Sequence, residues 1–234
     1  IVLKSYFNFF GIYFSPYLIK FCRDNLGNYD IIHLHLFRSI QNVIVCLYAD
    51  KLKIPYLIDA HGSLPRHFKI KFLKKYLYDL LIGNYILKKS KAFIAENELS
   101  YKEYIDFGVD DDKIAIIRPP FPIKDYENLP KKGLFKSKYD LNKKHIILFF
   151  GRIHYIKGID FLVESFNIIQ KRRNDVHLVI MGGDDGYKAN IQALIKKLNI
   201  QNKVLFTGYL SGRQKLSCII DSSVVVQTSR YEQG

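Results

Sequence analysis

Tryptophan is absent from this chain of 234 residues, methionine occurs once, and cysteine occurs three times. Cys22, Cys46 and Cys218 share no motif spacing, which argues against a disulfide framework and against a zinc finger. Cys46 and Cys218 fall within apolar helical patterns. We therefore expect core thiols, in a protein of the reducing cytoplasm.

A long apolar run is also missing. The uncharged stretch from Tyr6 to Ile19 is shorter than the about 20 residues of a membrane-spanning helix, and Gly11 and Pro16 interrupt it. An amphipathic core helix or an interfacial segment is expected there. No cleavable signal sequence is recognisable, although the chain begins at Ile1 and not at a methionine.

Acidic residues are few compared with basic ones. The chain has 22 Asp and Glu against 36 Lys and Arg, which gives a formal net charge of +14. This excess favours an anionic partner, such as a nucleotide diphosphate, a nucleic acid or an anionic membrane surface. A hydrophobic share of 48% excludes a disordered chain and allows sizeable cores.

Apolar strand-like runs alternate with amphipathic patterns, which predicts an α/β fold of parallel sheets covered by helices. Strands are expected at 30–35, 54–60, 92–95, 114–117, 145–150, 176–181, 203–207 and 223–228. Helices are expected at 39–52, 68–87, 99–107, 159–172, 187–199 and 211–220. The Pro- and Lys-rich region 122–142 lacks this periodicity. We interpret it as a linker between an amino-terminal domain, 1–121, and a carboxy-terminal domain, 143–234.

The turn between the strand 145–150 and the helix that follows carries the strongest chemical signal. It holds Gly151, Arg152, Lys157 and Gly158. A strand-to-helix turn presents backbone N–H groups and a positive dipole end to a phosphate, and Arg and Lys add charge there. The turn therefore indicates a diphosphate clamp, and the alternative is a solvent-exposed basic loop.

Five segments, taken in order, resemble glycosyltransferase family 4, whose retaining enzymes have the two-domain GT-B fold. They are Ile58-Asp59-Ala60-His61-Gly62, the turn with Gly151-Arg152 and Lys157-Gly158, Val179-Ile180-Met181-Gly182-Gly183-Asp184, Val204-Leu205-Phe206-Thr207-Gly208-Tyr209-Leu210, and Thr228-Ser229-Arg230-Tyr231-Glu232. The resemblance implies two Rossmann-like domains that face a cleft. Because family members are longer at both ends, we expect both domains to be incomplete, without the first β-α elements and the closing helices.

The resemblance also implies an activity. A family enzyme moves a sugar from a nucleotide-diphosphate sugar to a hydroxyl of a saccharide or lipid-linked acceptor, with retention, in polysaccharide or glycolipid assembly. Arg152 and Lys157 would neutralise the departing diphosphate, and Gly182 and Gly183 would shape the cleft beside them. No prosthetic group and no metal are expected.

Two residues are catalytic candidates. His61 follows a predicted strand and matches the family's active-site histidine, which could hydrogen-bond the donor sugar; the alternative is a polar turn residue. Glu232 matches the first glutamate of the family's acidic pattern, which contacts the sugar. However, Gln233 separates Glu232 from Gly234, whereas the family has glycine directly after the glutamate. The alternative for Glu232 is a surface residue.

Two further groups raise the question of a metal. His33 and His35 share one face of a strand, but no third ligand lies near them in the sequence. We interpret them as buried histidines bonded to the backbone. The run Asp110 to Asp112 has D-x-D spacing, yet it follows a helix-ending glycine and precedes a strand, so we expect a solvated turn.

Residues 66–91 read as a basic amphipathic helix. They include eight basic residues and one acid, Asp79, with apolar residues interleaved. Such a helix can lie on anionic lipid, which would place the protein at the inner face of the membrane. The alternative is a helix whose apolar face packs on its own sheet.

Other functions remain open at this stage. A sugar-nucleotide epimerase shares the fold, and a phosphorylase would need a cofactor-lysine region that we do not find. The charge permits a nucleic-acid-binding module, but no recognition motif is present, so no nucleic acid is expected as a partner. The fragment could also be inactive by itself.

Overall fold

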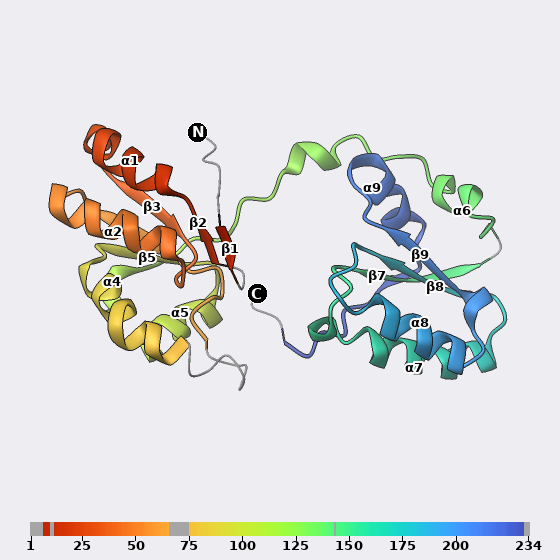
Figure 1. The fold of residues 1–234 in the computed structure, drawn as a ribbon. Coiled ribbons are helices and arrows are strands. Elements are labelled where there is room, and N and C mark those ends of the chain that lie inside the picture. Colours follow the sequence, from red (N-terminus) through yellow and green to blue (C-terminus); the bar gives the residue numbers. More distant parts are fainter. Residues whose placement is uncertain (1–6, 10–11, 66–74, 143, 232–234) are drawn as a thin grey trace. The chain divides into compact units, whose positions relative to one another are not determined.

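The computed structural model describes residues 7–9, 12–65, 75–142 and 144–231. These residues form two compact units, one up to Pro120 and the other from Phe121 onward (Figure 1). Within the described residues, no helix combines the length and the apolar character that crossing a membrane requires.

The first unit is built on a parallel sheet in the order β3-β4-β5-β6. Its strands are β3 (Ile32–His35), β4 (Tyr56–Asp59), β5 (Ala92–Ala95) and β6 (Ile114–Ile116). Its helices are α1 (Pro16–Asn25), α2 (Ile40–Leu52), α4 (Asn84–Lys89) and α5 (Glu98–Asp106), with short turns η1 (Leu26–Asn28) and η3 (Asp111–Lys113). Helix α1 packs against α2, and α2 against α4.

The register of this sheet aligns its core residues. Leu34, Ile58 and Phe93 lie opposite one another on β3, β4 and β5, and all three are buried. Cys46 is buried beside them in the same core, as predicted for a thiol in an apolar helix. Pairing that buries one side chain per strand fixes the register, since a slip of one residue would turn these side chains to the opposite face.

The beginning of the described chain differs from the prediction. The stretch from Tyr6 to Ile19 is not one helix, because β1 (Phe7–Phe9) and β2 (Ile12–Phe14) form an antiparallel pair. Helix α1 starts only at Pro16. Proline suits the first helical turn, where its missing N–H is not needed, so it begins this helix instead of interrupting it.

The second unit has a parallel sheet in the order β10-β7-β8-β9 (Figure 1). Its strands are β7 (His145–Phe150), β8 (Val176–Met181), β9 (Val204–Gly208) and β10 (Val224–Val225). Its helices are α6 (Leu134–Lys138), α7 (Ile159–Arg172), α8 (Lys188–Lys197) and α9 (Gly212–Asp221), with short turns η4 (Ile123–Tyr126), η5 (Tyr155–Lys157) and η6 (Gln201–Lys203). The order of the strands reverses at β7, which makes its carboxyl end the topological switch point of this sheet.

Alternating residues of β7 and β8 supply two cores. Ile146 and Leu148 pack with Cys218 of α9 and Phe135 of α6, whereas Phe149 packs with the buried residues of α7 and α8. Figure 1 shows α7 and α8 on one side of this sheet and α6 and α9 on the other. Successive residues of a strand point to opposite faces, so a strand that is apolar throughout is covered on both sides.

The predicted linker, 122–142, falls within the second unit. Helix α6 lies within it, and Asp221 at the end of α9 accepts hydrogen bonds from the backbone N–H groups of Gly133, Phe135 and Lys136. The Asp221 side chain is buried and negatively charged at the amino end of α6, where it satisfies N–H groups that the helix itself leaves unbonded.

Candidate functional site

The glycine turns after β7 and β8 are joined backbone to backbone. The N–H of Ile153 donates to the carbonyl of Gly183 over 2.8 Å, and the N–H of Asp185 donates to the carbonyl of Ile153 over 3.1 Å. A Cβ atom on Gly182 would lie 1.7 Å from the carbonyl oxygen of Gly151. This close approach requires glycine at 182. The two hydrogen bonds hold the predicted turns side by side at the carboxyl end of the sheet.

The chain after β10 crosses the turn that precedes α7. Thr228 donates its hydroxyl to the carbonyl of Lys157, and the N–H of Arg230 donates to the carbonyl of Ile156 over 2.8 Å. Gly158 has φ +60°, and a Cβ atom there would lie 2.1 Å from the carbonyl oxygen of Thr228. Two of the sequence motifs, the turn and the segment from Thr228, therefore meet at the switch point.

Arg230 and Asp160 hold this crossing, and sequence reasoning missed both. The Arg230 guanidinium donates to both carboxylate oxygens of Asp160 and lies 4.0 Å from the ring centroid of Tyr155 and 4.2 Å from that of Phe161. Burial alone would raise the pKa of Asp160, but the hydrogen bonds and charge of Arg230 outweigh it and lower that pKa. The sequence signal that could have indicated Asp160 is the presence of an acidic residue in the first turn of the helix α7.

Several backbone N–H groups of this turn are already engaged, whereas its side chains offer positive charge to an anion. The backbone N–H groups of Ile153, Ile156, Lys157 and Gly158 are engaged in hydrogen bonds within the turn or with its neighbour. Arg152 is 69% exposed and pairs with Asp185 over 2.5 Å. Exposed pairs contribute only about 0–1 kcal/mol, so a phosphate can replace Asp185 at little cost.

Asp184, next to Gly183, hydrogen-bonds the backbone at the start of α8. One oxygen of Asp184 accepts from the N–H groups of Gly186, Tyr187 and Lys188 at the start of α8. This is a capping role, which agrees with the prediction that Asp184 does no direct charge chemistry.

A second group of polar residues gathers at the carboxyl ends of β3, β4 and β5 in the first unit. His35 ends β3 opposite Asp59, which ends β4. Nδ1 of His61 lies 2.6 Å from Oε1 of Glu96 and 3.4 Å from Oδ1 of Asp59. Nε2 of His61 lies 2.7 Å from Nδ1 of His35. The predicted candidate His61 is thus part of a cluster whose other members come from neighbouring strands.

His33 and His35 are exposed, so the interpretation as buried histidines bonded to the backbone was wrong. Their ring centroids lie 4.3 Å apart. Loss of solvation, followed by the charge of His35, lowers the pKa of His33. The two rings are exposed because they alternate with the buried Leu34 on β3, on the face that this leucine leaves free.

The cluster also has the spacing of metal ligands. Candidate ligand atoms of His33, His35 and Asp59 lie within 4.8 Å of one another, as do those of Asp59, His61 and Glu96. No third ligand lies near the two histidines in the sequence, but the fold brings Asp59 of the next strand close to them. Both nitrogens of His61 already lie at hydrogen-bonding distance from other groups, and the prediction of a metal-free protein stays a prediction.

Unusual backbone geometry surrounds the cluster. Leu36 and His61 have positive φ values of 67° and 45°, a region that residues other than glycine rarely adopt. The side-chain amide of Asn42 donates to the carbonyls of His35 and Leu36, and the hydroxyl of Tyr104 accepts from the N–H of Ala60 over 2.9 Å. Strained residues held by surrounding bonds are concentrated at functional sites, which favours this cluster as one.

A buried ion pair supports the loop after β4. Arg38 and Asp79 are 11% and 5% exposed and 2.7 Å apart, and Arg38 also donates to the carbonyls of Ser63 and Leu64. Asp79 begins the π-helical turn η2 (Asp79–Gly83), which follows helical residues 75–78 and precedes α4. The single acid of the basic segment thus has a structural role that its sequence context did not indicate.

Some predicted features lie outside the described residues. These are Glu232 and the part of the basic segment that carries Arg66, Lys69, Lys71 and Lys74. The run Asp110 to Asp112 is described: it is exposed, in and beside η3, which confirms the solvated turn.

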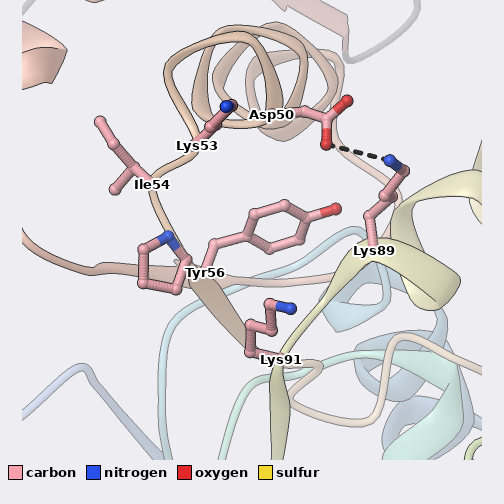
Figure 2. Close-up of a pocket in the computed structure, with 7 residues that line it drawn as sticks. Asp50, Lys53, Ile54, Tyr56, Lys89 and Lys91 are labelled. Carbon is pink, nitrogen blue, oxygen red and sulfur yellow. Dashed lines mark ion pairs between the residues drawn. The ribbon is translucent and has the colours of Figure 1, made fainter.

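A cavity of about 430 Å³ lies elsewhere in the first unit, where β4 and β5 begin. Figure 2 shows Lys53, Lys89 and Lys91 around Tyr56, with Asp50 paired to Lys89 over 3.2 Å. The histidine cluster stands at the opposite, carboxyl ends of the same strands. Ligands of parallel sheets bind at carboxyl ends, so the cavity is not the candidate site.

Comparison with solved structures confirms the fold. HepE from Anabaena, solved in complex with UDP-glucose, aligns with a TM-score of 0.76 at 18% identity, over 94% of this chain and 58% of that one. The GT-B fold predicted from the sequence motifs is thereby shown.

Curated relatives also align with most of this chain. An N,N'-diacetylbacillosaminyl-diphospho-undecaprenol alpha-1,3-N-acetylgalactosaminyltransferase of Campylobacter jejuni is 30% identical over 79% of this chain and 47% of its own length. An uncharacterized 41.2 kDa protein in the cps region of Klebsiella pneumoniae is 24% identical over 88% of this chain and 55% of its own length. The chain thus spans about half the length of these relatives.

Two family descriptions match the two units in order. "Glycosyltransferase Family 4" matches residues 2–124 and "Glycosyl transferases group 1" matches residues 131–234. The first match alone covers more than half of the chain, and the glycine turns and the histidine cluster lie inside the two matches. The chain therefore belongs to glycosyltransferase family 4, a family of enzymes.

Proposed function

We propose that the protein containing this chain transfers a sugar, with retention, from a nucleotide-diphosphate sugar to an acceptor hydroxyl in the assembly of a polysaccharide or glycolipid. A uridine nucleotide is the proposed donor class, because the structurally similar HepE was solved with UDP-glucose. The lipid-linked sugar in the name of the Campylobacter relative supports a saccharide or lipid-linked acceptor.

The observation that carries this proposal is the turn at the switch point of the second sheet. Arg152 and Lys157 lie on the turn that runs from β7 to the start of α7, and Arg152 is held by an exposed pair with Asp185. Fixed cations near a leaving diphosphate stabilise the negative charge that grows in the transition state, which accelerates the transfer. Gly158 and Gly182 give the backbone its close approach beside these cations, and Gly151 and Gly183 lie in the same two turns.

His61 and Glu232 complete the proposal as residues that orient the sugar. His61 belongs to the cluster at the carboxyl ends of β3, β4 and β5, where parallel sheets bind ligands. The role of Glu232 rests on its place in the family's acidic pattern. No metal and no prosthetic group are required by this scheme.

Calorimetric titration with UDP, GDP and ADP tests the diphosphate clamp. UDP is expected to bind, and Lys157→Ala or Arg152→Ala should weaken that binding at least tenfold, about 1.4 kcal/mol. Lys171→Ala, at an exposed position near the end of α7, serves as the control and should leave binding unchanged. Binding that does not respond to either clamp variant would contradict the proposed site.

A product assay separates transfer from epimerisation. A transferase yields a glycosylated acceptor together with free nucleotide diphosphate, whereas a sugar-nucleotide epimerase yields an altered sugar nucleotide and no transferred product. Chromatography of a reaction with UDP-sugar and a saccharide acceptor distinguishes the two. Conversion of the sugar without any acceptor product would favour the epimerase.

Contact with an anionic membrane is a further part of the proposal. In the described part of the basic segment, Leu77, Leu80 and Leu81 are 46%, 56% and 73% exposed, near the exposed Lys88 and Lys89. Apolar and basic side chains together suit the surface of an anionic bilayer. Cosedimentation with phosphatidylglycerol vesicles should exceed that with phosphatidylcholine vesicles, and Leu81→Glu should reduce it. Equal sedimentation with both lipids would contradict the membrane contact.

A further inference from the structure

The cavity of about 430 Å³ at the beginning of β4 and β5 has a mainly basic lining. Lys53, Lys89 and Lys91 surround it, and Asp50 is the one acid among the described residues that line it (Figure 2). The histidine cluster lies at the opposite ends of the same strands. A ligand of this cavity is therefore separate from the sugar of the proposed reaction.

The single carboxylate leaves most of the positive charge in the cavity uncompensated. Oδ1 of Asp50 lies 3.2 Å from Nζ of Lys89, and its Oδ2 accepts a hydrogen bond of 2.8 Å from the hydroxyl of Tyr85. The hydrogen bonds from Tyr85 and from Lys89 lower the pKa of Asp50, which keeps it ionised at neutral pH. Neither Lys53 nor Lys91 has a partner for its ammonium group among the described residues.

The ends of the two neighbouring helices do not account for all of these lysines. Helices α2 and α4 end beside the cavity, and the carboxyl end of a helix attracts cations because it carries about half a negative charge. Lys51 and Lys88 lie in the last turns of these helices, outside the cavity, and complement that charge. Lys91 lies beyond α4, directly before β5, so its charge is additional.

The backbone holds the two unpaired lysines in place. Lys53 ends α2 in the left-handed region, with φ 58° and ψ 32°, where glycine or asparagine is usual. Its N–H donates to the carbonyl of Asp50, and across the cavity the N–H of Lys91 donates to the carbonyl of Tyr56 over 2.9 Å. Both lysines thus project from backbone that is ordered without a ligand, which reduces the entropy that binding costs.

We propose that this cavity binds a phosphomonoester group, which belongs either to a small phosphorylated molecule or to the headgroup of a lipid. Three ammonium groups and one carboxylate leave two positive charges in the lining. A phosphomonoester carries about −1.5 to −2 at pH 7 and offers three acceptor oxygens, so it matches this lining better than a carboxylate or a phosphodiester with a single negative charge. Ile54 and Pro55 line the same cavity and can contact the carbon atoms next to the phosphate.

Titration of the intact chain with glycerol 3-phosphate, at constant ionic strength and pH 7.5, tests the site. The backbone N–H signals of Lys53, Ile54 and Lys91 in nuclear magnetic resonance spectra should shift and saturate. The affinity should fall as the pH decreases below about 6, where the phosphate loses its second negative charge. Dimethyl phosphate, a diester with one negative charge, should bind more weakly. The absence of saturable shifts, or equal affinity for the diester, would overturn the proposal.

Substitution of single lysines locates the binding. Lys53→Asn and Lys91→Gln each remove one ammonium group and should weaken the binding of glycerol 3-phosphate about threefold or more. Asparagine tolerates the left-handed backbone at position 53, so the end of α2 should keep its structure. Lys51→Gln removes the same charge from α2 outside the cavity and should leave the affinity unchanged. Equal weakening by all three substitutions would show attraction to the general surface charge and overturn the cavity as the site.

Vesicles distinguish the two sources of the phosphate. The headgroup of phosphatidic acid is a phosphomonoester, whereas that of phosphatidylglycerol is a phosphodiester, and vesicles of the two lipids are compared at equal surface charge. Stronger cosedimentation with phosphatidic acid that declines in Lys91→Gln, but not in Lys51→Gln, would identify a lipid headgroup. Binding of glycerol 3-phosphate without a preference between the lipids would identify a small molecule. A folded protein that binds neither glycerol 3-phosphate nor phosphatidic acid would refute the inference.

Discussion

At the scale of single residues, the candidate sites depend on positions where one side chain, or none, fits. Gly182 admits no Cβ because the carbonyl of Gly151 occupies that space, whereas its neighbour Gly183 has open space around it. Two adjacent glycines in one motif therefore have different physical requirements. A sequence motif alone does not distinguish them, since both are written as the same letter.

Replacement of each glycine by alanine measures this difference. Gly182→Ala should lower the free energy of unfolding of the second unit by about 1–3 kcal/mol or more, because the new methyl group forces the two turns apart. Gly183→Ala is the matched control and should change that free energy by less than about 1 kcal/mol. Urea unfolding curves provide the measurement. Equal effects of the two substitutions would contradict the described contact between the turns.

His177 on β8 predicts a dependence of stability on pH. Its Nδ1 is buried without a hydrogen-bond partner among the described residues. Burial first, and then the nearby charges of Lys144 and Lys203, lower its pKa from the ordinary 6.5. Because the folded state disfavours the protonated ring, stability is fully present above about pH 6.5 and is lost as the pH falls toward the lower folded pKa.

A variant without this ring isolates the effect. His177→Phe has no group to titrate at this position, so its stability should fall less than that of the unaltered protein as the pH decreases below about 6.5. Thermal unfolding over a pH series compares the two. Parallel curves for both proteins would mean that His177 does not contribute to the acid sensitivity.

At the scale of elements, strands with neighbours on both sides were the easiest to predict. The runs 145–150 and 176–181 coincide with β7 and β8, because strands covered on both faces are apolar throughout. The predicted strand 223–228 shortens to Val224–Val225, which pairs on one side only. The single helix expected over Tyr6 to Ile19 was wrong, since a short antiparallel pair and the start of a helix together resemble one apolar run.

The histidine cluster could not be predicted in full from the sequence. His61 was recognised by its motif, but its contacts with His35 and Glu96 depend on the pairing of β3 with β4 and of β4 with β5. That pairing is decided by packing between strands that are distant in the sequence. His35 and Glu96 would have required the sheet order before they could be assigned to the same site.

Helix α5 supplies a test of how an element supports this cluster. The buried hydroxyl of Tyr104 accepts from the N–H of Ala60, the residue before His61. Tyr104→Phe leaves that buried N–H unbonded, which should cost about 1–3 kcal/mol of stability. Tyr101→Phe on the same helix removes a hydroxyl that bonds the exposed Asp111, and should change stability by less than about 0.5 kcal/mol. Urea unfolding of both variants is the measurement, and a Tyr104→Phe protein as stable as the control would contradict the role of this bond.

At the scale of the whole molecule, each unit has its own core. The buried residues of the second unit gather on the two faces of its sheet, and those of the first unit form a separate cluster. The turn with Arg152 and Lys157, its neighbouring glycine turn and the crossing at Thr228 all lie within the second unit. The parts of the proposed diphosphate clamp are therefore encoded by one half of the chain.

Residues 121–234, produced alone, should fold and bind UDP within a few-fold of the affinity of the whole chain. The reason is that the proposed contacts with the diphosphate all come from this unit. Circular dichroism checks the fold and calorimetry checks binding, with Lys157→Ala in the same fragment as the control. A folded fragment that no longer binds UDP would mean that the first unit contributes to nucleotide binding.

The strand order of the second sheet has a consequence for the emerging chain during synthesis. Strands β7, β8 and β9 can pair in the order in which the ribosome produces them, but the other edge of β7 is covered only when β10 is made, with Ile147 opposite Val224. Until then this apolar strand offers unpaired N–H and C=O groups to any neighbouring nascent chain. We expect translation arrested before Val224 to yield polypeptides that aggregate or recruit chaperones, and chains released after this strand to escape that fate.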